Sequence, residues 1–165
     1  MHFFSLDHVG FVVSSIERSI AWWSTFLGRE PFDEGTWLSS EIGDYVGRAV
    51  GYEGCDLSAA FWSLPGGTVL ELIEYHNPPT RVVDMETYNV GNAHLCLETP
   101  DMDADYARMR DLAEFRSVEP VTSQWGPYKG ARVCFLRSPD GITIELVEFS
   151  PSGRPFEANS PYSNP

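Results

Sequence analysis

The stretch LELIEY at residues 70–75 decides how this chain folds, because residues 144–149, IELVEF, nearly repeat it. Alternate side chains of a β-strand share one face, so Glu71 and Glu145 would each lie between apolar neighbours. A carboxylate in that setting is costly unless a cation or strong hydrogen bonds compensate it. Because the same arrangement occurs twice, we interpret both glutamates as metal ligands.

The composition excludes several classes of partner. Hydrophobic residues make up 42% of the chain and aromatic residues 13%, which is typical of a globular protein rather than a disordered one. The 24 acidic residues against 11 basic ones give a net charge of -13. Nucleic acids and anionic membrane surfaces both require basic patches. We therefore expect a small-molecule substrate, with no nucleic-acid partner and no membrane partner.

The cysteines and the N-terminal sequence indicate the cellular compartment of the protein. The chain has three cysteines, an odd number, and Cys96 and Cys134 fall in predicted strands, where a buried thiol acts as a small hydrophobic group. The first residues lack the basic region of a signal peptide, and no apolar run approaches the length of a membrane span. These features predict a soluble protein of the reducing cytoplasm.

The first half of the chain has the pattern β-α-β-β-β. Its first strand contains His8, and the helix that follows begins with a capping box of Ser14 and Glu17 and ends at Gly28. Residues 39–57 indicate a long loop or short helix. The helix carries an apolar stripe of Ile16, Ile20, Trp23 and Leu27, and the predicted strands cover residues 6–13, 31–38, 58–64 and 68–75, the last two joined by a glycine turn.

The second half repeats this pattern after a segment, residues 76–90, with the composition of a linker. His94 occupies the place of His8, and Thr99-Pro100-Asp101 supplies a helix cap with proline in the first turn. Met102, Tyr106, Met109 and Ala113 form the helical stripe, and the predicted strands cover residues 92–99, 115–125, 131–137 and 142–149.

Together these patterns predict an α+β fold of paired βαβββ modules. We expect one domain over residues 1–149, with a first module at about 5–76 and a second at about 91–149. Residues 150–165 hold four prolines and no periodicity, and we expect an irregular C-terminal arm.

The repeat places His8, Glu71, His94 and Glu145 in equivalent positions. A single histidine on a strand is usually a structural side chain, but the fourfold match favours a metal site with two nitrogen and two oxygen ligands. Zinc, nickel, cobalt, manganese and iron(II) all accept such ligands. Glu74 and Glu148 also repeat, but on the opposite strand face, and we expect them to be solvated or salt-bridged.

Four stretches resemble the vicinal oxygen chelate superfamily, the glyoxalase/bleomycin-resistance/extradiol-dioxygenase group, over about residues 5–149. They are DHVGFVV (7–13), GGTVLELIEY (66–75), NAHLCLET (92–99) and KGARVCFLRSPDGITIELVEF (129–149). The resemblance implies paired modules whose curved mixed sheets form a cleft around one divalent metal ion, often in a homodimer. The ion of that family chelates two oxygens of a substrate or intermediate.

The ligand set separates the branches of that family. The extradiol dioxygenases of that family have an iron site of two histidines and one glutamate, with no carboxylate ligand at the position of Glu71. The His/Glu/His/Glu set of this chain is similar instead to the ligand sets of glyoxalase I and the epimerases. Glyoxalase I usually has Arg and Asn, which hold glutathione, where this chain has Val12 and Tyr75. Methylmalonyl-CoA epimerases typically show paired histidines where this chain has Ala93-His94. Neither glutathione nor a CoA ester is therefore favoured.

The leading hypothesis is a metal-dependent isomerase, epimerase or lyase that moves a proton next to a carbonyl through a metal-bound enediolate. Glu145 or Glu71 would be the base. Two alternatives stay open, an iron(II)-dependent extradiol-type dioxygenase and a non-catalytic protein that binds or sequesters a small molecule. The aromatic residues that could shape the pocket are Trp37, Tyr45, Tyr52, Trp62 and Trp125.

Overall fold

The computed structural model describes residues 5–150, and the chain divides into two compact units, residues 1–83 and 84–165. The boundary falls inside the segment 76–90 that the sequence assigns to a linker. The predicted C-terminal arm, beyond Ser150, lies outside the described residues. Within the described part, no helix is long and apolar enough to cross a membrane.

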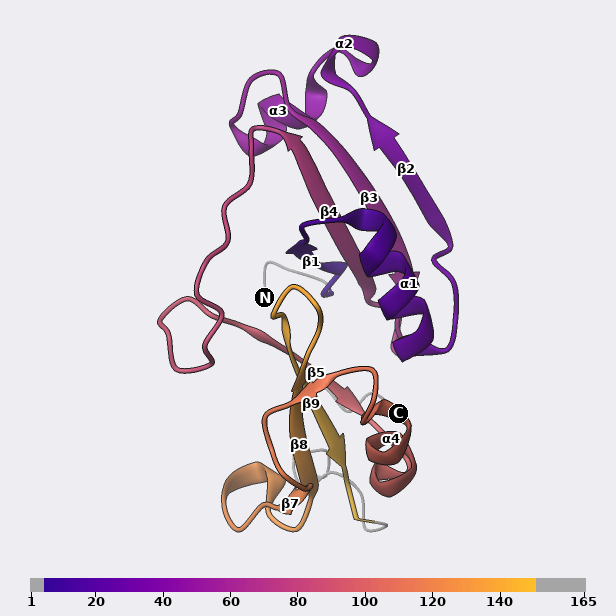
Figure 1. Ribbon diagram of the computed structural model, residues 1–165, viewed down its shortest axis with the longest axis vertical. Coiled ribbons are helices and arrows are strands. Elements are labelled where there is room, and N and C mark those ends of the chain that lie inside the picture. Colours follow the sequence, from indigo (N-terminus) through magenta and orange to yellow (C-terminus); the bar gives the residue numbers. More distant parts are fainter. Residues whose placement is uncertain (1–4, 151–165) are drawn as a thin grey trace. The chain divides into compact units, whose positions relative to one another are not determined.

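The first unit is a four-stranded mixed sheet with a helix across one face (Figure 1). The strand order is β1-β4-β3-β2, with β1 parallel to β4 and the other pairs antiparallel. The region predicted as a loop or short helix contains two short helices. The elements are β1 (His8–Val12), α1 (Ile16–Leu27), β2 (Asp33–Trp37), α2 (Ser39–Ile42), α3 (Tyr45–Val50), β3 (Asp56–Ser63) and β4 (Val69–Asn77).

The second unit repeats this topology with strand order β5-β9-β8-β6, and β7 also pairs with β8. The strand β5 is parallel to β9, as β1 is to β4. The prediction of paired βαβββ modules is thus confirmed. The elements are β5 (His94–Glu98), α4 (Met102–Met109), β6 (Glu114–Phe115), β7 (Val121–Thr122), the 3-10 helix η1 (Gly126–Tyr128), β8 (Arg132–Arg137) and β9 (Thr143–Glu148).

The single strand predicted over residues 115–125 is wrong. The structure has two short strands there, β6 and β7, which pair with opposite ends of β8. Between them Val118 is exposed, and Pro120 has no N–H to contribute to a ladder. The apolar residues of this stretch therefore do not belong to one continuous strand.

Helix α1 begins one residue later than the sequence predicts. The N-cap is Ser15, whose hydroxyl accepts a hydrogen bond from the backbone N–H of Arg18 at 3.3 Å, so the predicted capping box of Ser14 and Glu17 is wrong. Gly28 ends the helix in the left-handed conformation, as expected. The buried face is shifted accordingly and comprises Ile16, Ser19, Trp22, Trp23 and Phe26, whereas Ile20 and Leu27 are half-buried.

Helix α4 begins at a different cap from the predicted one. Asp101 is the N-cap, and its carboxylate accepts a hydrogen bond from the N–H of Ala104 at 2.9 Å. Pro100 therefore precedes the helix and does not lie in its first turn. The hydroxyl of Thr99 donates to Asp105 at 2.6 Å, which ties the entry of the helix to its first turn.

Glu74 and Glu148 have the same role in the two units. Glu74 accepts a hydrogen bond from the N–H of Ile16, the first residue of α1, at 2.8 Å. Glu148 accepts one from the N–H of Met102, the first residue of α4, at 3.2 Å. A carboxylate at a helix N-terminus satisfies an otherwise unpaired donor and complements the helix dipole. Arg132 also forms a salt bridge with Glu148 at 3.4 Å, one of the two predicted alternatives, and Nδ1 of His76 lies 3.8 Å from Glu74.

Each helix packs on one face of its own sheet and forms the core there. In the first unit Leu70, Leu72 and Trp62 are fully buried, and in the second Leu136 and Ile144 are. Burying such a side chain stabilises the fold by roughly 1.5–3 kcal/mol. Glu71 and Glu145 alternate with these core residues along β4 and β9, so their side chains lie on the other face of each sheet.

The prediction that Cys96 is buried is wrong. Cys134 has no exposed surface and Cys55 has almost none, but Cys96 is exposed on β5. Leu95, its neighbour in sequence, is the β5 residue that points into the core. Cys96 therefore shares the exposed face of β5 with His94.

Candidate metal centre

The two sheets hold their histidine and glutamate in one register. In the first, Gly10 lies opposite Glu71, and His8 is two residues before Gly10 on β1. In the second, Cys96 lies opposite Glu145, and His94 is two residues before Cys96 on β5. Residues opposite one another in neighbouring strands share a face. Both pairs are thus diagonal neighbours on the face that the helix leaves uncovered.

In the first unit the imidazole Nε2 of His8 lies 3.6 Å from the Oε2 of Glu71. The other ring nitrogen, Nδ1, donates to the carboxylate of Asp7 at 2.9 Å. This bond raises the pKa of His8, and the negative charge of Glu71 acts in the same direction. A carboxylate on one ring nitrogen fixes the orientation of the ring, a frequent arrangement behind histidines that bind metals.

The second unit holds its pair more closely. The Nε2 of His94 lies 3.0 Å from the Oε2 of Glu145, whose side chain is 14% exposed. The ring of His94 makes an edge contact with the ring of Phe135, with the centroids 5.7 Å apart. Phe135 is also directly opposite Glu145 in the sheet. An aromatic ring thus borders both members of this pair.

The donor chemistry of these residues fits a divalent ion. Each unit holds one imidazole nitrogen close to one carboxylate oxygen, and zinc, nickel, cobalt, manganese and iron(II) all accept donors of these two types. Each histidine is about half exposed, so an ion can reach it. Within residues 5–150, no three His, Cys, Asp or Glu side chains gather around one metal position. The four-ligand set therefore stays a prediction.

An apolar cluster lies on the Glu71 face of the first sheet. Phe61 is directly opposite Glu71, and it meets the ring of Trp37 edge to face at 6.3 Å. Burial raises the pKa of Tyr75, which packs in the same cluster. The cluster consists of Cys55, Leu57 and Ala59 with the partly buried Trp37, Val46, Phe61, Ile73 and Tyr75.

The predicted pocket aromatics separate into three groups. Trp37 belongs to the cluster beside Glu71. Trp62 is fully buried, opposite Leu70 in the core, and its indole N–H donates to the carbonyl of Arg29, so its predicted place in the pocket is wrong. Tyr45, Tyr52 and Trp125 are exposed.

A cavity of about 240 Å³ lies beside His94 in the second unit. Its lining residues are Thr87, Asn92, Ala93, His94 and Phe135. Sequence reasoning missed Thr87 and Asn92, because Thr87 lies in the segment read as a linker and Asn92 at the predicted start of a strand. The one available signal was the position of Asn92, two residues before His94, which puts both on one side of an extended chain.

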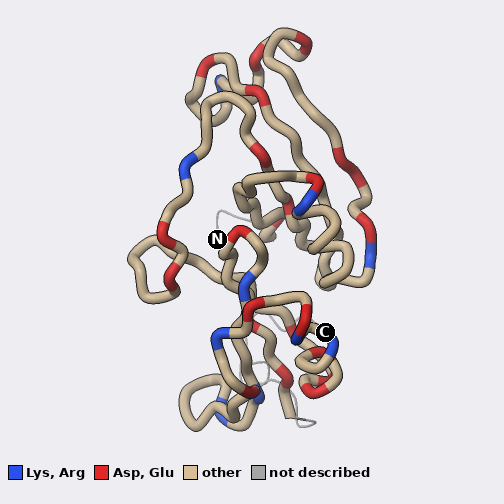
Figure 2. The backbone as a smooth tube through the Cα atoms, viewed as in Figure 1, with Lys and Arg blue, Asp and Glu red and all other residues tan. Residues whose placement is uncertain are grey.

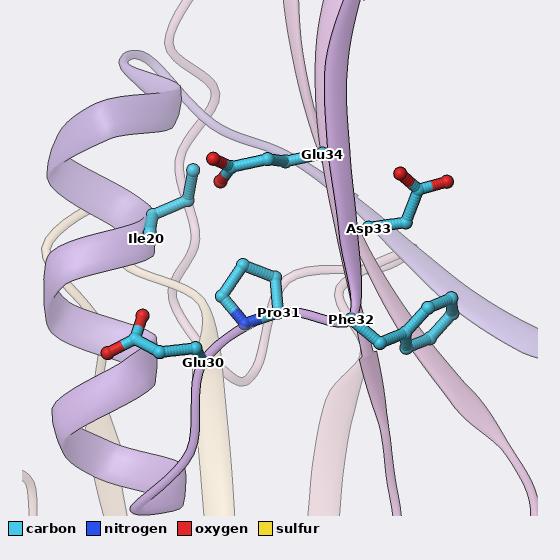
Figure 3. Close-up of a pocket in the computed structure, with 6 residues that line it drawn as sticks. All are labelled: Ile20, Glu30, Pro31, Phe32, Asp33 and Glu34. Carbon is cyan, nitrogen blue, oxygen red and sulfur yellow. The ribbon is translucent and has the colours of Figure 1, made fainter.

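A larger hollow of about 460 Å³ lies between α1 and β2. Glu34 extends toward Ile20 of α1, whereas Asp33 and Phe32 point away from the helix (Figure 3). The strand β2 is at the opposite edge of the sheet from β1, which carries His8. This hollow is therefore separate from the His8–Glu71 pair.

Acidic residues follow the chain through both units, and basic residues are sparse (Figure 2). The basic side chains of the second unit are largely matched by carboxylates. Arg132 pairs with Asp103 at 2.5 Å, and Arg108 pairs with Asp105 at 2.8 Å. This distribution disfavours binding of polyanionic ligands.

Comparison with known proteins assigns the chain to a family. The model of the Glyoxalase/Bleomycin resistance protein/Dioxygenase superfamily matches residues 7–122. The chain is 27% identical over 155 residues to a 2-epi-5-epi-valiolone epimerase from Actinomyces sp, covering 93% of this chain and 83% of that protein. It is 29% identical over 153 residues to the lactoylglutathione lyase of Salmonella typhimurium, covering 90% and 96%.

A solved structure shows the same fold. The crystal structure of a glyoxalase family protein from Bacillus cereus matches with a TM-score of 0.70 and 24% identity, covering 90% of this chain and 95% of that one. The two mixed sheets of the present chain are therefore those of a glyoxalase-like fold.

Proposed function

Because the chain belongs to the Glyoxalase/Bleomycin resistance protein/Dioxygenase superfamily, we propose that it is a metal-dependent isomerase or epimerase. It would move a proton next to the carbonyl of a small oxygenated substrate. The observation that carries this proposal is the repeated pair of imidazole and carboxylate in one register, at His8 and Glu71 and at His94 and Glu145. The epimerase and lyase among its relatives support the same class of reaction.

In this proposal His8, Glu71, His94 and Glu145 hold one divalent ion, of zinc, nickel, cobalt, manganese or iron. Such an ion, when bound, supplies a Lewis acid that withdraws electrons from the carbonyl and stabilises the negative charge of the enediolate. Both histidines must be neutral to bind it. Asp7, which accepts from Nδ1 of His8, would keep Nε2 of that ring directed toward the ion.

The glutamates move the proton. A general base must come within hydrogen-bond distance of the proton that it removes, so it needs room to adjust. Glu71 has more room than Glu145, because its contact with histidine is longer and the residue opposite it is Gly10 rather than Cys96. We therefore assign removal of the α-proton to Glu71 and return of a proton on the other face to Glu145.

The surroundings of the two pairs would exclude water from part of the site. Phe61 and Phe135 lie opposite the two glutamates, and Trp37 and Tyr75 extend the apolar surface in the first unit. Apolar neighbours lower the local dielectric and strengthen the interaction of a carboxylate with developing charge.

Metal analysis tests the proposal. Protein purified without chelators, with Glu71→Ala beside it, is expected to hold about one divalent ion per chain, and the variant is expected to lose it. Glu74→Gln is the matched control, because Glu74 is on the other face of the same strand, and it should retain the ion. Solvent-deuterium exchange into carbonyl compounds then tests the reaction.

Two results would contradict this proposal. Metal retained in Glu71→Ala together with oxygen uptake on a catechol would indicate a three-ligand, dioxygenase-like site. No metal in the wild-type protein after reconstitution, with tight binding of a drug and no turnover, would indicate a sequestering protein.

We also propose a homodimer in the cytoplasm. Paired modules of this family often form dimers, and the buried thiols Cys55 and Cys134 suit a reducing compartment. Sedimentation that shows only monomer would contradict the oligomeric state.

A further inference from the structure

We propose that the cavity beside His94 binds an uncharged, hydroxyl-bearing part of the substrate, and that Asn92 selects it by accepting a hydrogen bond. The inference rests on the proposed function, because it names the substrate class of that site. The substrate would be a small polyhydroxylated ketone rather than a ketone joined to a charged carrier.

The size and lining of the cavity limit its ligand. About 240 Å³ is below the range of roughly 300–1,000 Å³ usual for drug-sized ligands. Thr87, Asn92 and His94 are the lining residues with polar side chains, and Ala93 and Phe135 are the apolar ones. These side chains suit a small ring or short chain that carries hydroxyl groups.

The carboxamide of Asn92 is fixed in one orientation. Its Nδ2 donates to the carbonyl of Met85 at 2.9 Å and to that of Glu86 at 2.8 Å, so both amide protons are used. The Oδ1 is buried and has no hydrogen-bond partner among the described residues. A buried acceptor without a partner is unfavourable, and a hydroxyl donated by a ligand in the adjoining cavity would satisfy it.

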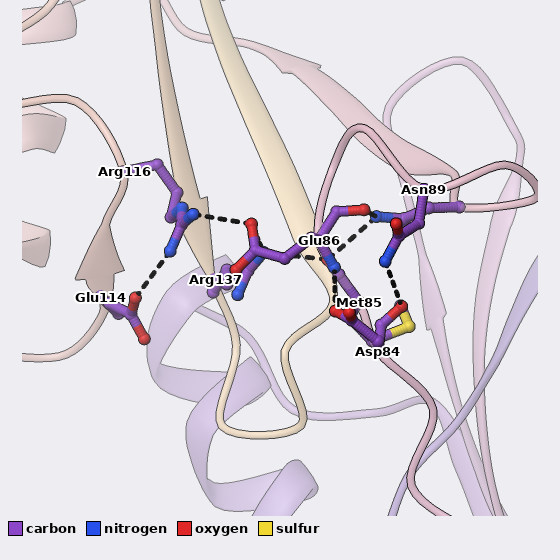
Figure 4. Close-up of polar contacts among 8 residues, drawn as sticks. Asp84, Met85, Glu86, Asn89, Glu114, Arg116 and Arg137 are labelled. Carbon is purple, nitrogen blue, oxygen red and sulfur yellow. Dashed lines mark hydrogen bonds and ion pairs between the residues drawn. The ribbon is translucent and has the colours of Figure 1, made fainter.

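The basic residues near this segment are already paired. Glu86 binds Arg116 at 2.8 Å and Arg137 at 3.1 Å, and Arg116 also pairs with Glu114 at 3.3 Å (Figure 4). These contacts hold the segment against β6 and β8. They also neutralise the two arginines, so the cavity attracts a neutral ligand rather than an anionic one.

The test compares two ketones that differ only in their outer hydroxyl groups. The probes are 2-hydroxycyclohexanone and myo-inosose, a pentahydroxycyclohexanone. Dissociation constants come from calorimetry on the purified protein with its metal, and deuterium exchange at the carbon next to the carbonyl is followed by NMR. We expect the wild-type protein to bind myo-inosose at least about tenfold more tightly than 2-hydroxycyclohexanone.

Asn92→Leu keeps the size of the side chain and removes its acceptor, together with the two donors that hold the carbonyls of Met85 and Glu86. It should weaken myo-inosose binding by about tenfold and change 2-hydroxycyclohexanone binding less than twofold, because one lost hydrogen bond corresponds to about that factor. Thr87→Val should give a smaller loss with the same selectivity. Asn89→Ala, on the same segment but not at the cavity, should leave both dissociation constants unchanged.

The outcomes separate the inference from the proposed function. Equal affinity of the wild-type protein for the two ketones overturns the inference. An equal loss for both in Asn92→Leu also overturns it, because a hydrogen bond to an outer hydroxyl group weakens only myo-inosose binding when it is removed. Selective binding that depends on Asn92, without deuterium exchange, supports the inference and overturns the reaction. Exchange without that selectivity supports the reaction and overturns the inference.

Discussion

The two histidine–glutamate pairs share a register but differ in their neighbours. Glu71 lies 3.6 Å from its histidine and opposite Gly10, whereas Glu145 lies 3.0 Å from its histidine and opposite Cys96. Glu71 is also more exposed, at 21% against 14%. One repeated strand pair therefore supplies both a carboxylate with room to move and one that is held in place.

The residues around the two pairs also differ between the units. In the first unit, residues 39–55 between β2 and β3 contain α2 and α3 and contribute Val46 and Cys55 to the apolar cluster beside Glu71. At the equivalent place, between β6 and β8, the second unit has β7 and the 3-10 helix η1, and a small cavity lies beside its His94.

The largest expected effect is a difference in labelling rate between two thiols of the second sheet, Cys134 and Cys96. Burial raises the pKa of Cys134 to about 11, so at pH 8 almost none of it is the reactive thiolate. Cys96 is exposed beside Glu145 and should react with a thiol reagent at least about 100-fold faster. Mass spectrometry after timed labelling measures both rates.

Labelling in the presence of a divalent metal ion adds a second comparison between the two thiols. If Glu145 and His94 hold an ion, added zinc should slow the labelling of Cys96 and leave the rate at Cys134 unchanged. Equal labelling of the two thiols in the native protein would contradict the difference in burial.

The next largest expected effect is a loss of metal affinity when the space beside Glu71 is filled. A Cβ added at Gly10 would approach Oε2 of Glu71 to 3.2 Å, so Gly10→Ala should displace the carboxylate by a few tenths of an ångström. We expect metal affinity to fall by about tenfold, the lower end for changes beside a ligand, with little change in the free energy of unfolding. Calorimetric metal titration measures it.

The matched control changes the residue opposite the glutamate of the second unit. Cys96→Gly gives Glu145 the open neighbour that Glu71 has, and it should change metal affinity less than Gly10→Ala does. Unchanged affinity in Gly10→Ala would show that the difference between the two glutamates has no effect on the site.

The repeat in the sequence predicts the topology and the two pairs, because the period of two along a strand fixes which residues share a face. It does not predict the face of Trp62, which depends on the register across the hairpin turn. Nor does it predict the cap of α1, since Ser14 and Ser15 are equally suitable and tertiary packing chooses between them. The sequence does not predict Asn92 and Thr87 as cavity residues, because their segment is positioned by ion pairs through Glu86, and ion pairs leave no periodic pattern in a sequence.

A smaller effect concerns the helix contacts that the two units share. Glu74→Ala and Glu148→Ala each leave the first N–H of a helix without its acceptor, which should lower the free energy of unfolding by about 1 kcal/mol. The loss should be larger for Glu148, because its partner Arg132 is always charged, whereas His76 beside Glu74 is charged only when protonated. Urea denaturation measures both.

Glutamine at these positions provides the control. Glu74→Gln and Glu148→Gln retain an acceptor oxygen and should recover most of the stability. Equal stability of the alanine variants and the wild-type protein would show that solvent replaces these contacts.

The smallest expected effect is on stability and concerns the short helix α2, which lies between β2 and β3 of the first unit. The carboxylate of Asp56 accepts a hydrogen bond from the N–H of Ser39, the first residue of α2, at 2.6 Å, and this bond lowers the pKa of Asp56. A lowered pKa means that the stabilisation is present above the unfolded value of about 3.9 and is lost as the pH falls through the folded value. Asp56→Asn should therefore be less stable than the wild-type protein at pH 7, and the difference should close on acidification below pH 4.

Ser39→Pro removes the donor of the same hydrogen bond. Proline suits the first position of a helix, and the extended backbone of Leu38 suits a residue before proline, so α2 should persist. This variant should lose the same pH-dependent contribution, and adding Asp56→Asn to it should cost little more. Urea unfolding of the four proteins at pH 7 and pH 3 measures this coupling. Additive losses at pH 7 would show that the Asp56 carboxylate stabilises the first unit through some contact other than the N-terminus of α2.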